Sequence, residues 1–195
     1  MKKIFMAIVG IAFFSGAFAQ KNKFSDSKFH FSAGAELGIA TGPFSDAHSV
    51  GFGVSGQAEY TIATNTNITA TVGVIGYPGR KISKNGYPDG YRYSNSTIVP
   101  IKAGIKYFLS GGFYTAAQLG VGIFDNYVDV NSTSPLYPYG TYYGSETAVA
   151  FTPMLGYEFR SNSGKAFDAS FKYDLYARQG GAFGSVGFRF AYKFK

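Results

Sequence analysis

The chain has 195 residues, a length that suits one domain, and it contains 20 Phe, 16 Tyr and 26 Gly but no Trp and no Cys. The absence of Cys excludes a disulfide framework and a thiolate metal site. The formal net charge is +7, yet no run of Lys and Arg exceeds two residues. The composition therefore argues against a nucleic-acid partner and favours an anionic lipid surface.

The first nineteen residues are predicted to be a cleaved signal peptide. Lys2 and Lys3 form a basic start, residues 4–14 are mostly apolar, and Ala17-Phe18-Ala19 is a small-x-small cleavage site. The apolar stretch is too short for the roughly 20 residues that a helix needs to cross a bilayer, which argues against an uncleaved anchor. Cleavage would leave a single domain at residues 20–195, with a net charge of +5 once Lys2 and Lys3 are removed.

The remaining chain alternates between apolar and polar residues in eight successive segments. The apolar faces, taken at every second residue, cover 29–39, 52–62, 68–76, 99–107, 113–123, 147–159, 167–175 and 186–194. A period of two is typical of β-strands with one apolar and one polar face. None of the apolar positions is charged, whereas the interleaved positions carry many charges. One face of every strand must therefore lie where a charge is costly.

The connections between these segments alternate in length. The long ones cover 40–51, 77–98, 124–146 and 176–185, and the short ones cover 63–67, 108–112 and 160–166. In an up-and-down meander, all long connections lie at one end and all short ones at the other, as in outer-membrane barrels. The sequence predicts an all-β fold: an eight-stranded antiparallel up-and-down transmembrane β-barrel with long extracellular loops and short periplasmic turns. Both termini would be periplasmic, and residues 20–27 are too few for a periplasmic domain.

A soluble lipocalin-like barrel with its apolar face inward is the main alternative. Two observations favour the membrane barrel. The polar face is rich in Gly, which weakens an exposed strand but relieves crowding in a narrow lumen. The apolar face also carries aromatic residues near the short connections, which suits a periplasmic girdle at the membrane interface. The predicted girdle consists of Phe29, Tyr60, Tyr107, Phe113, Tyr157, Phe159, Phe167, Tyr192 and Phe194.

The polar faces hold positive and negative charges in nearly equal number. Eight strands leave little room for water, so we expect a self-neutralising ion-pair network in the lumen, and a charged pore or gate is the alternative. The predicted network consists of Glu36, Glu59, Lys102, Lys106, Glu158, Asp168, Lys172, Asp174, Arg189 and Lys193.

Candidate catalytic groups are few. Asp46, His48 and Ser49 are the only set that could serve an enzyme acting on lipid at the outer rim. In a catalytic triad, a general base lies between the nucleophile and the carboxylate that orients the base. Residues that are close neighbours in one loop rarely reach this arrangement. His30 and His48 are predicted at opposite ends of the barrel, which separates them as metal ligands. We therefore expect no enzyme activity, no catalytic or metal site and no cofactor.

Two of the long loops are rich in Tyr, whose rings provide contact area at low entropic cost. They are candidate contacts for a glycan or a protein ligand, and an outer aromatic belt is the alternative. The candidate residues are Tyr87, Tyr91, Tyr93, Tyr137, Tyr139, Tyr142 and Tyr143.

The stretch from Pro100 to Phe108, followed by Gln118 to Gly122, resembles the central hairpin of the outer membrane protein β-barrel domain family of Bacteroidota. The resemblance extends from Phe29 to Phe194 and includes a final alternating strand similar to the assembly signal of such barrels. It implies a barrel in a Gram-negative outer membrane. We expect a monomer in contact with lipid, lipopolysaccharide and the barrel insertion machinery. The expected role is structural or surface-interacting at the cell surface. A small-solute channel or ligand transporter and a lipid-modifying rim enzyme remain alternatives.

Overall fold

The computed structural model describes residues 28–81, 93–128, 142–160, 166–179 and 181–194. The predicted signal peptide at residues 1–19 lies outside these ranges. The elements are β1 (Phe29–Thr41), α2 (Phe44–Ala47), β2 (Val50–Ala63), β3 (Thr66–Tyr77), β4 (Ser96–Ser110), β5 (Phe113–Val128), β6 (Tyr142–Arg160), β7 (Ala166–Arg178) and β8 (Gly181–Phe194). No helix in the described ranges is long and apolar enough to cross a membrane.

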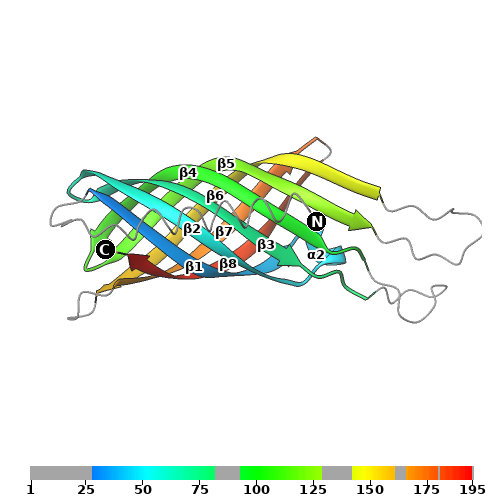
Figure 1. The fold of residues 1–195 in the computed structure, drawn as a ribbon, viewed down its shortest axis with the longest axis horizontal. Helices are drawn as coiled ribbons and strands as arrows, with labels where there is room; N and C mark the ends of the chain where they lie inside the picture. Colours follow the sequence, from blue (N-terminus) through cyan, green and yellow to red (C-terminus); the bar gives the residue numbers. More distant parts are fainter. Residues whose placement is uncertain (1–27, 82–92, 129–141, 161–165, 180, 195) are drawn as a thin grey trace, which may run out of the picture.

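The eight strands form one closed barrel (Figure 1). Each strand pairs antiparallel with the next, and β1 pairs antiparallel with β8, with Phe31 opposite Phe194 and Thr41 opposite Gly184. Closure matters because it leaves no long strand edge free along the wall of the barrel. The predicted eight-stranded antiparallel up-and-down barrel is therefore confirmed.

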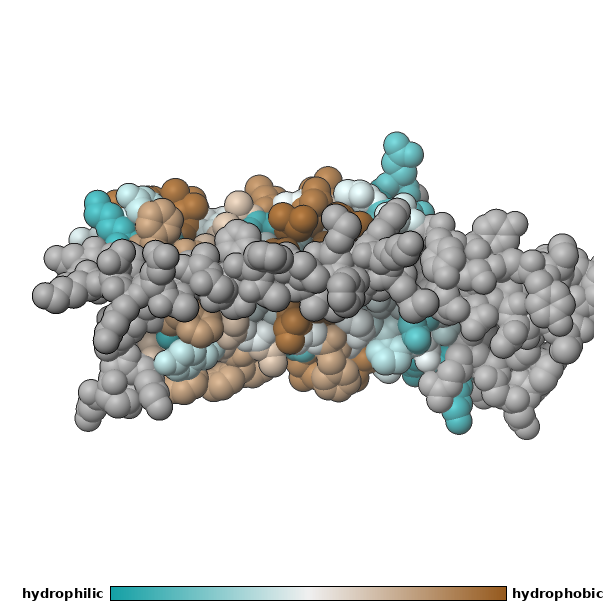
Figure 2. All heavy atoms as spheres, in the orientation of Figure 1, coloured by the Kyte–Doolittle hydropathy of each residue, from teal (hydrophilic) through white to brown (hydrophobic). Residues whose placement is uncertain are grey.

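The wall is apolar on the outside. Phe52, Leu119, Leu155 and Phe171 are each more than half exposed, although they are large hydrophobic residues. Figure 2 shows such residues covering much of the visible wall between the two ends of the barrel. A water-soluble monomer rarely exposes an apolar patch of more than a few hundred Å². The barrel is thus inverted relative to a soluble one, with its hydrophobic side chains outward.

The strands continue further at the loop end than the hydrophobic pattern indicates. β5 extends to Val128 and β6 begins at Tyr142, so this hairpin projects beyond its neighbours (Figure 1). The expected long connection at 176–185 is wrong, because only positions 179 and 180 separate β7 from β8. Arg178 pairs with Gly181. The φ angle of Gly181 is 146°, a backbone conformation that residues with a Cβ rarely adopt. Glycine at this position therefore permits the tight hairpin.

Inward-facing glycines make room for large rings inside the barrel. A Cβ on Gly156 would lie 2.3 Å from the ring of Tyr114, and a Cβ on Gly38 would lie 2.1 Å from the hydroxyl of Tyr77. Both contacts are shorter than van der Waals packing allows. The glycines on the polar faces therefore relieve crowding in a narrow interior, as the sequence predicted.

Candidate functional site

The ten charged residues of the predicted network all lie inside the barrel, and none is more than 8% exposed. They come from six different strands and alternate with outward apolar residues, as the period of two requires. Five are cations and five are carboxylates, so the interior is neutral when all are ionised. A buried charge is tolerated only with a partner, and the contacts described below supply one for each.

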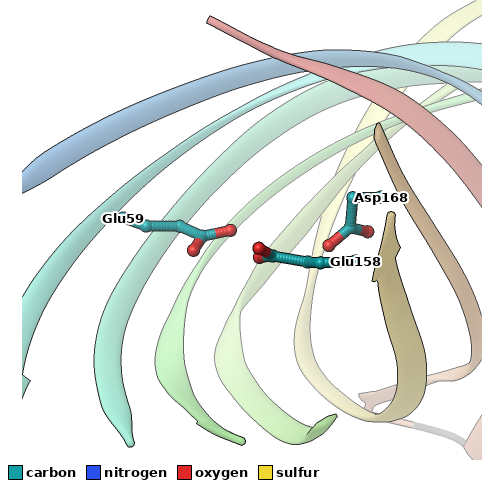
Figure 3. Close-up of side chains that lie close together, drawn as sticks. All are labelled: Glu59, Glu158 and Asp168. Atoms are coloured by element: carbon teal, nitrogen blue, oxygen red, sulfur yellow. The ribbon is translucent and has the colours of Figure 1, made fainter. Parts of the chain in front are cut away.

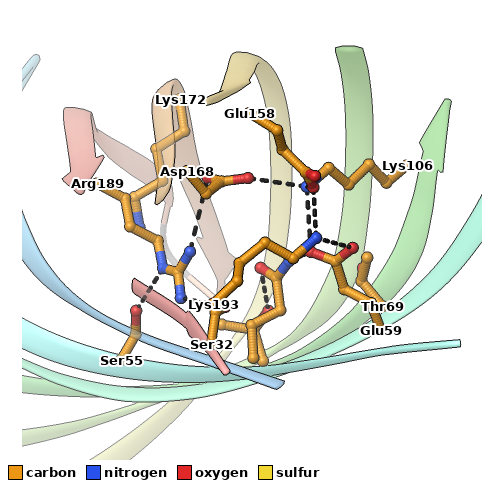
Figure 4. Close-up of polar contacts among 12 residues, drawn as sticks. Ser32, Ser55, Glu59, Thr69, Lys106, Glu158, Asp168, Lys172, Arg189 and Lys193 are labelled. Atoms are coloured by element: carbon orange, nitrogen blue, oxygen red, sulfur yellow. Dashed lines mark hydrogen bonds and ion pairs between the residues drawn. The ribbon is translucent and has the colours of Figure 1, made fainter. Parts of the chain in front are cut away.

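Five of these residues form the turn-end cluster: Glu59, Lys106, Glu158, Asp168 and Lys193 (Figure 4). Lys106 Nζ lies 3.0 Å from Glu59 Oε1, 2.6 Å from Glu158 Oε1 and 2.8 Å from Asp168 Oδ2. Lys193 Nζ also binds Glu59 and Glu158. A Lys ammonium has three donors, and Lys106 uses them on three carboxylates from three strands.

Neutral side chains also donate hydrogen bonds to two of these carboxylates, Glu59 and Asp168. Asn67 and Gln57 donate hydrogen bonds of 2.9 and 2.8 Å to the two oxygens of Glu59. The Tyr114 hydroxyl donates a bond of 2.8 Å to Asp168 Oδ1. Such hydrogen bonds to charged groups are stronger than neutral ones, and they fix the carboxylates in place.

The carboxylates of Glu59, Glu158 and Asp168 converge from three strands (Figure 3). One oxygen of each lies within 4.8 Å of the others, which is a spacing that could hold a metal ion. Lys106 Nζ, however, contacts all three carboxylates and occupies the position that a cation would take. The ammonium group thus supplies the charge that a metal would otherwise provide.

Four further residues form the mid-barrel cluster: Glu36, Lys102, Lys172 and Asp174. Lys102 Nζ lies 2.7 Å from Asp174 Oδ1 and 3.0 Å from the Thr152 hydroxyl. Lys172 Nζ lies 2.8 Å from Glu36 and 3.0 Å from Asp174. Each Lys in this cluster therefore shares Asp174, and the cluster is neutral in itself.

Arg189 links the two clusters. Its guanidinium lies 3.6 Å from Glu36 and 3.7 Å from Asp168, and it donates hydrogen bonds to the hydroxyls of Ser55 and Ser32 (Figure 4). The turn-end cluster has two cations and three carboxylates, so the charge of Arg189 neutralises its excess. The network is continuous from β1 to β8 across the interior.

Apolar side chains close the interior at the loop end, which the sequence reasoning missed. The loop-end plug consists of Ile75, Tyr77, Ile98, Phe124 and Tyr176, with Phe44 and Phe183 packed against them. Phe124 and Tyr176 meet edge to face with centroids 5.1 Å apart, and Tyr77 donates a bond of 3.0 Å to the Ser185 hydroxyl. The charged residues of the network lie on the turn side of this plug.

A signal for the plug was present in the sequence. Ile75 lies on the predicted inward face of the 68–76 segment, after Thr69, Thr71 and Gly73, and Tyr77 is the next residue in the same phase. Ile98, Phe124 and Tyr176 each follow the inward phase one residue beyond a predicted segment. The prediction of a polar interior is thus incomplete at this end of the barrel.

A small apolar cluster lies beside the charged network inside the barrel. Phe108 packs against Tyr114, and Tyr114 forms a small buried cluster with Met154 and Ala116. Lys106 Nζ lies 3.9 Å from the centroid of the Tyr114 ring, a cation–π contact that adds to its ion pairs. Tyr114 is therefore part of the charged network as well as of this apolar cluster.

The predicted girdle residues lie on the outer wall at the turn end, and none of them is buried. Several contact one another directly: Phe29 with Tyr60, Phe113 with Tyr157, and Tyr192 with Phe194. This arrangement has the geometry of an interfacial aromatic belt. Its role in a membrane stays a prediction.

The candidate rim residues Asp46, His48 and Ser49 do not form a catalytic arrangement. His48 Nε2 lies 3.2 Å from the Ser94 carbonyl oxygen, and the ring packs 4.4 Å from that of Phe44. Within the described part of the chain, no hydrogen bond joins His48 to Asp46 or Ser49. Burial lowers the pKa of His48, so its ring is neutral at pH 7.

The structure separates the candidate loop tyrosines into three groups. Tyr142 and Tyr143 are in strand β6, paired with Val128 and Tyr127, so their assignment to a loop is wrong. Backbone pairing of the β5–β6 hairpin continues past the predicted apolar faces, which end at position 123 and begin again at position 147. Tyr93 precedes β4 and is exposed. Tyr87, Tyr91, Tyr137 and Tyr139 lie outside the described residues.

Comparison with solved structures shows the same fold. Neisserial surface protein A matches at 16% identity and a TM-score of 0.59, over 87% of this chain and 97% of that one. The N-terminal β-barrel domain of Pseudomonas aeruginosa OprF matches at 15% identity and 0.51, over 86% and 98%. Ail of Yersinia pestis, solved with the heparin analogue sucrose octasulfate, matches at 13% and 0.52, over 85% and 97%.

These structural relatives are eight-stranded outer-membrane β-barrels. At such identities the likeness concerns the fold alone. No family model matches the chain, and no curated protein matches its sequence.

Proposed function

We propose that this chain is an integral outer-membrane β-barrel of a Gram-negative bacterium, with a structural or surface-interacting role and no catalytic one. The main support for the proposal is the distribution of side chains, which is the reverse of that in a soluble barrel. Uncharged apolar residues such as Leu119 and Leu155 are exposed on the wall, while ten charged residues are buried and paired inside. Lipid provides an apolar environment for the exposed side chains of the wall. Closure of the barrel pairs the backbone N–H and C=O groups, to which lipid cannot form hydrogen bonds.

The proposal includes residues 1–19 as an export signal and membership of the Bacteroidota barrel family. The basic start and the small-x-small site support the first, and the Pro100 to Phe108 pattern supports the second. The loops would face outward and contact lipopolysaccharide or a ligand. Arg80, Lys81 and Arg178 lie at the loop end, where cations suit the phosphates of an outer leaflet.

Labelling of single cysteines tests this orientation, because the chain has no native Cys to react. Gln179 is exposed between β7 and β8 at the loop end, and Asn65 is exposed between β2 and β3 at the turn end. We expect Gln179→Cys to react with an impermeant maleimide on intact cells. Asn65→Cys should react only after the outer membrane is opened. The opposite pattern would show that the barrel is inserted the other way.

A small-solute channel is the second candidate, and the filled interior argues against it. The loop-end plug and the two charged clusters occupy the lumen in series, and the cations and carboxylates are held by one another. The purified barrel in a planar bilayer should therefore show no stable conductance, with an open porin in the same bilayer as the positive control. A steady current of porin size through the wild-type barrel would establish the channel instead.

A further inference from the structure

The β5–β6 hairpin has a strand edge at the loop end that no described strand covers. The pairing of β6 with β5 continues to Tyr142 opposite Val128, whereas the pairing of β6 with β7 ends at Val149 opposite Ala177. β7 stops at Arg178 and turns back into β8. Residues 142–147 of β6 therefore lie beyond the end of β7, in the part of the hairpin that projects from the barrel (Figure 1). We call them the free edge.

The structure leaves space beside the free edge where β7 departs from β6. A groove of about 470 Å³ lies on the outer wall at this point, and its lining includes Thr147, Val149, Ala177 and Gln179. Thr147 and the two residues before it, Ser145 and Glu146, are all exposed. The described residues therefore leave room for another chain to approach β6 in line with β7.

The chemistry of a strand edge selects an extended peptide. The edge presents backbone N–H and C=O groups in alternation, and only another extended backbone repeats both groups at the same spacing. An acyl chain has neither group, and a glycan does not repeat them with this period. Peptides that add to a sheet edge bind mainly through such main-chain hydrogen bonds.

The charge of the hairpin favours a basic peptide. The sequence from Phe124 to Ala148 contains Asp125, Asp129 and Glu146 but no Lys, Arg or His, although the whole chain has a net charge of +7. Asp125 is exposed and pairs with Ser145, so it lies on the opposite face of the hairpin from Glu146. A cation on either face of an added strand would therefore meet a carboxylate.

Arg178 already forms an ion pair with Glu146 at the base of the free edge. The two side chains are 41% and 53% exposed, and exposed ion pairs contribute little to stability. A basic residue of a ligand can thus share or replace this contact. Asp125 remains as a second carboxylate on the other face.

A second copy of this chain in the same membrane fits the free edge poorly. Both copies would be inserted in the same direction, with strands tilted by about 35–45° from the membrane normal. A two-fold axis along the normal would then make the two β6 strands cross at about 70–90°, which is incompatible with a ladder of hydrogen bonds. The occupant that fits is a segment of a different protein.

We propose that the free edge binds an extended segment of another protein that carries Lys or Arg, and that this segment adds as a strand antiparallel to β6. The position of β7 sets the direction, because an added strand in line with β7 continues its antiparallel pairing with β6. A basic residue opposite Glu146 contacts that carboxylate, and its neighbour opposite Ser145 reaches across this small residue toward Asp125. The inference rests on the surface-interacting role proposed above and specifies the class of partner.

The test uses the labelled peptide Thr-Val-Thr-Lys-Lys-Thr-Val-Thr as the probe and the full-length barrel in detergent, with binding measured by fluorescence anisotropy. We expect saturable binding of one peptide per chain. The same peptide methylated on every backbone nitrogen keeps its charge but has no N–H donors, and it should not bind. A peptide with Glu in place of both Lys residues should bind at least about tenfold more weakly.

Variants of the barrel assign the contacts. Asp125→Asn and Glu146→Gln should each weaken the Lys peptide about threefold, and the double variant should weaken it about tenfold. Asp46→Asn is the matched control, because it removes an exposed carboxylate from helix α2 at the same end of the barrel, and it should change nothing.

Three results would each overturn the proposal: no saturable binding to the wild type, equal binding of the methylated peptide, or wild-type affinity in the double variant. These results concern the free edge alone and leave the orientation of the barrel to the cysteine labelling described above. A reversed labelling pattern would instead contradict the proposed outward loops without altering the binding of the peptide to the purified barrel.

Discussion

Replacing Lys106 by Met should lower the free energy of unfolding by about 3–5 kcal/mol, as expected when one partner of a buried ion pair is removed. Lys106 Nζ contacts Glu59, Glu158 and Asp168, and its side chain is 1% exposed. Without it, three converging carboxylates would face one another with only Lys193 and Arg189 as nearby cations. Urea titration of the barrel refolded in lipid or detergent measures the loss.

Lys102→Met is the matched comparison, because it removes the same group from the mid-barrel cluster. Asp174 would keep its contact with Lys172 at 3.0 Å, so we expect a smaller loss than for Lys106→Met. The double variant Lys106→Met with Glu158→Gln removes one carboxylate as well, and it should recover part of the stability. Equal losses for the two Met variants, with no recovery in the double variant, would mean that the turn-end cluster is not held together by Lys106.

The side of the wall on which each charged residue lies could be predicted from the sequence alone. Alternation with a period of two fixes the face once the strand is recognised, so Glu36, Lys102 and Asp174 were assigned to the interior correctly. Neutrality could be predicted as well, since an interior this narrow cannot hold a large excess of one charge.

The pairing of those residues could not be predicted in the same way. Lys106 and Asp168 are 62 positions apart, and they meet because β4 and β7, three places apart around the barrel, bring them to the same height. That height depends on strand tilt and register, which a single sequence does not specify. The contact of the Lys106 ammonium group with three carboxylates could therefore be found only in the structure.

The loop end was the least predictable part of the fold. The predicted strands end where the apolar alternation stops, yet backbone pairing continues to Arg178 with Gly181 and to Val128 with Tyr142. Pairing needs only N–H and C=O groups, so it does not depend on side-chain pattern. The plug occupies this region, which explains why it was not expected.

The claim that the wall faces lipid is tested most directly by a charge placed at its middle. Leu119 is 62% exposed and lies opposite Ala103 and Phe151 on the neighbouring strands, away from both ends. In a lipid bilayer, Leu119→Arg should cost about 2–4 kcal/mol. Leu109→Arg is the matched control, because Leu109 is 60% exposed at the turn end of β4, where the cost should be about 0–1 kcal/mol.

The measurement is the free energy of unfolding of both variants and the wild type, refolded in phospholipid vesicles and titrated with urea. The account predicts a loss of about 2–4 kcal/mol for Leu119→Arg and a clearly smaller loss for Leu109→Arg. If both variants were as stable as the wild type, the middle of the wall would be in contact with water, and the membrane-spanning barrel proposed for this chain would be contradicted.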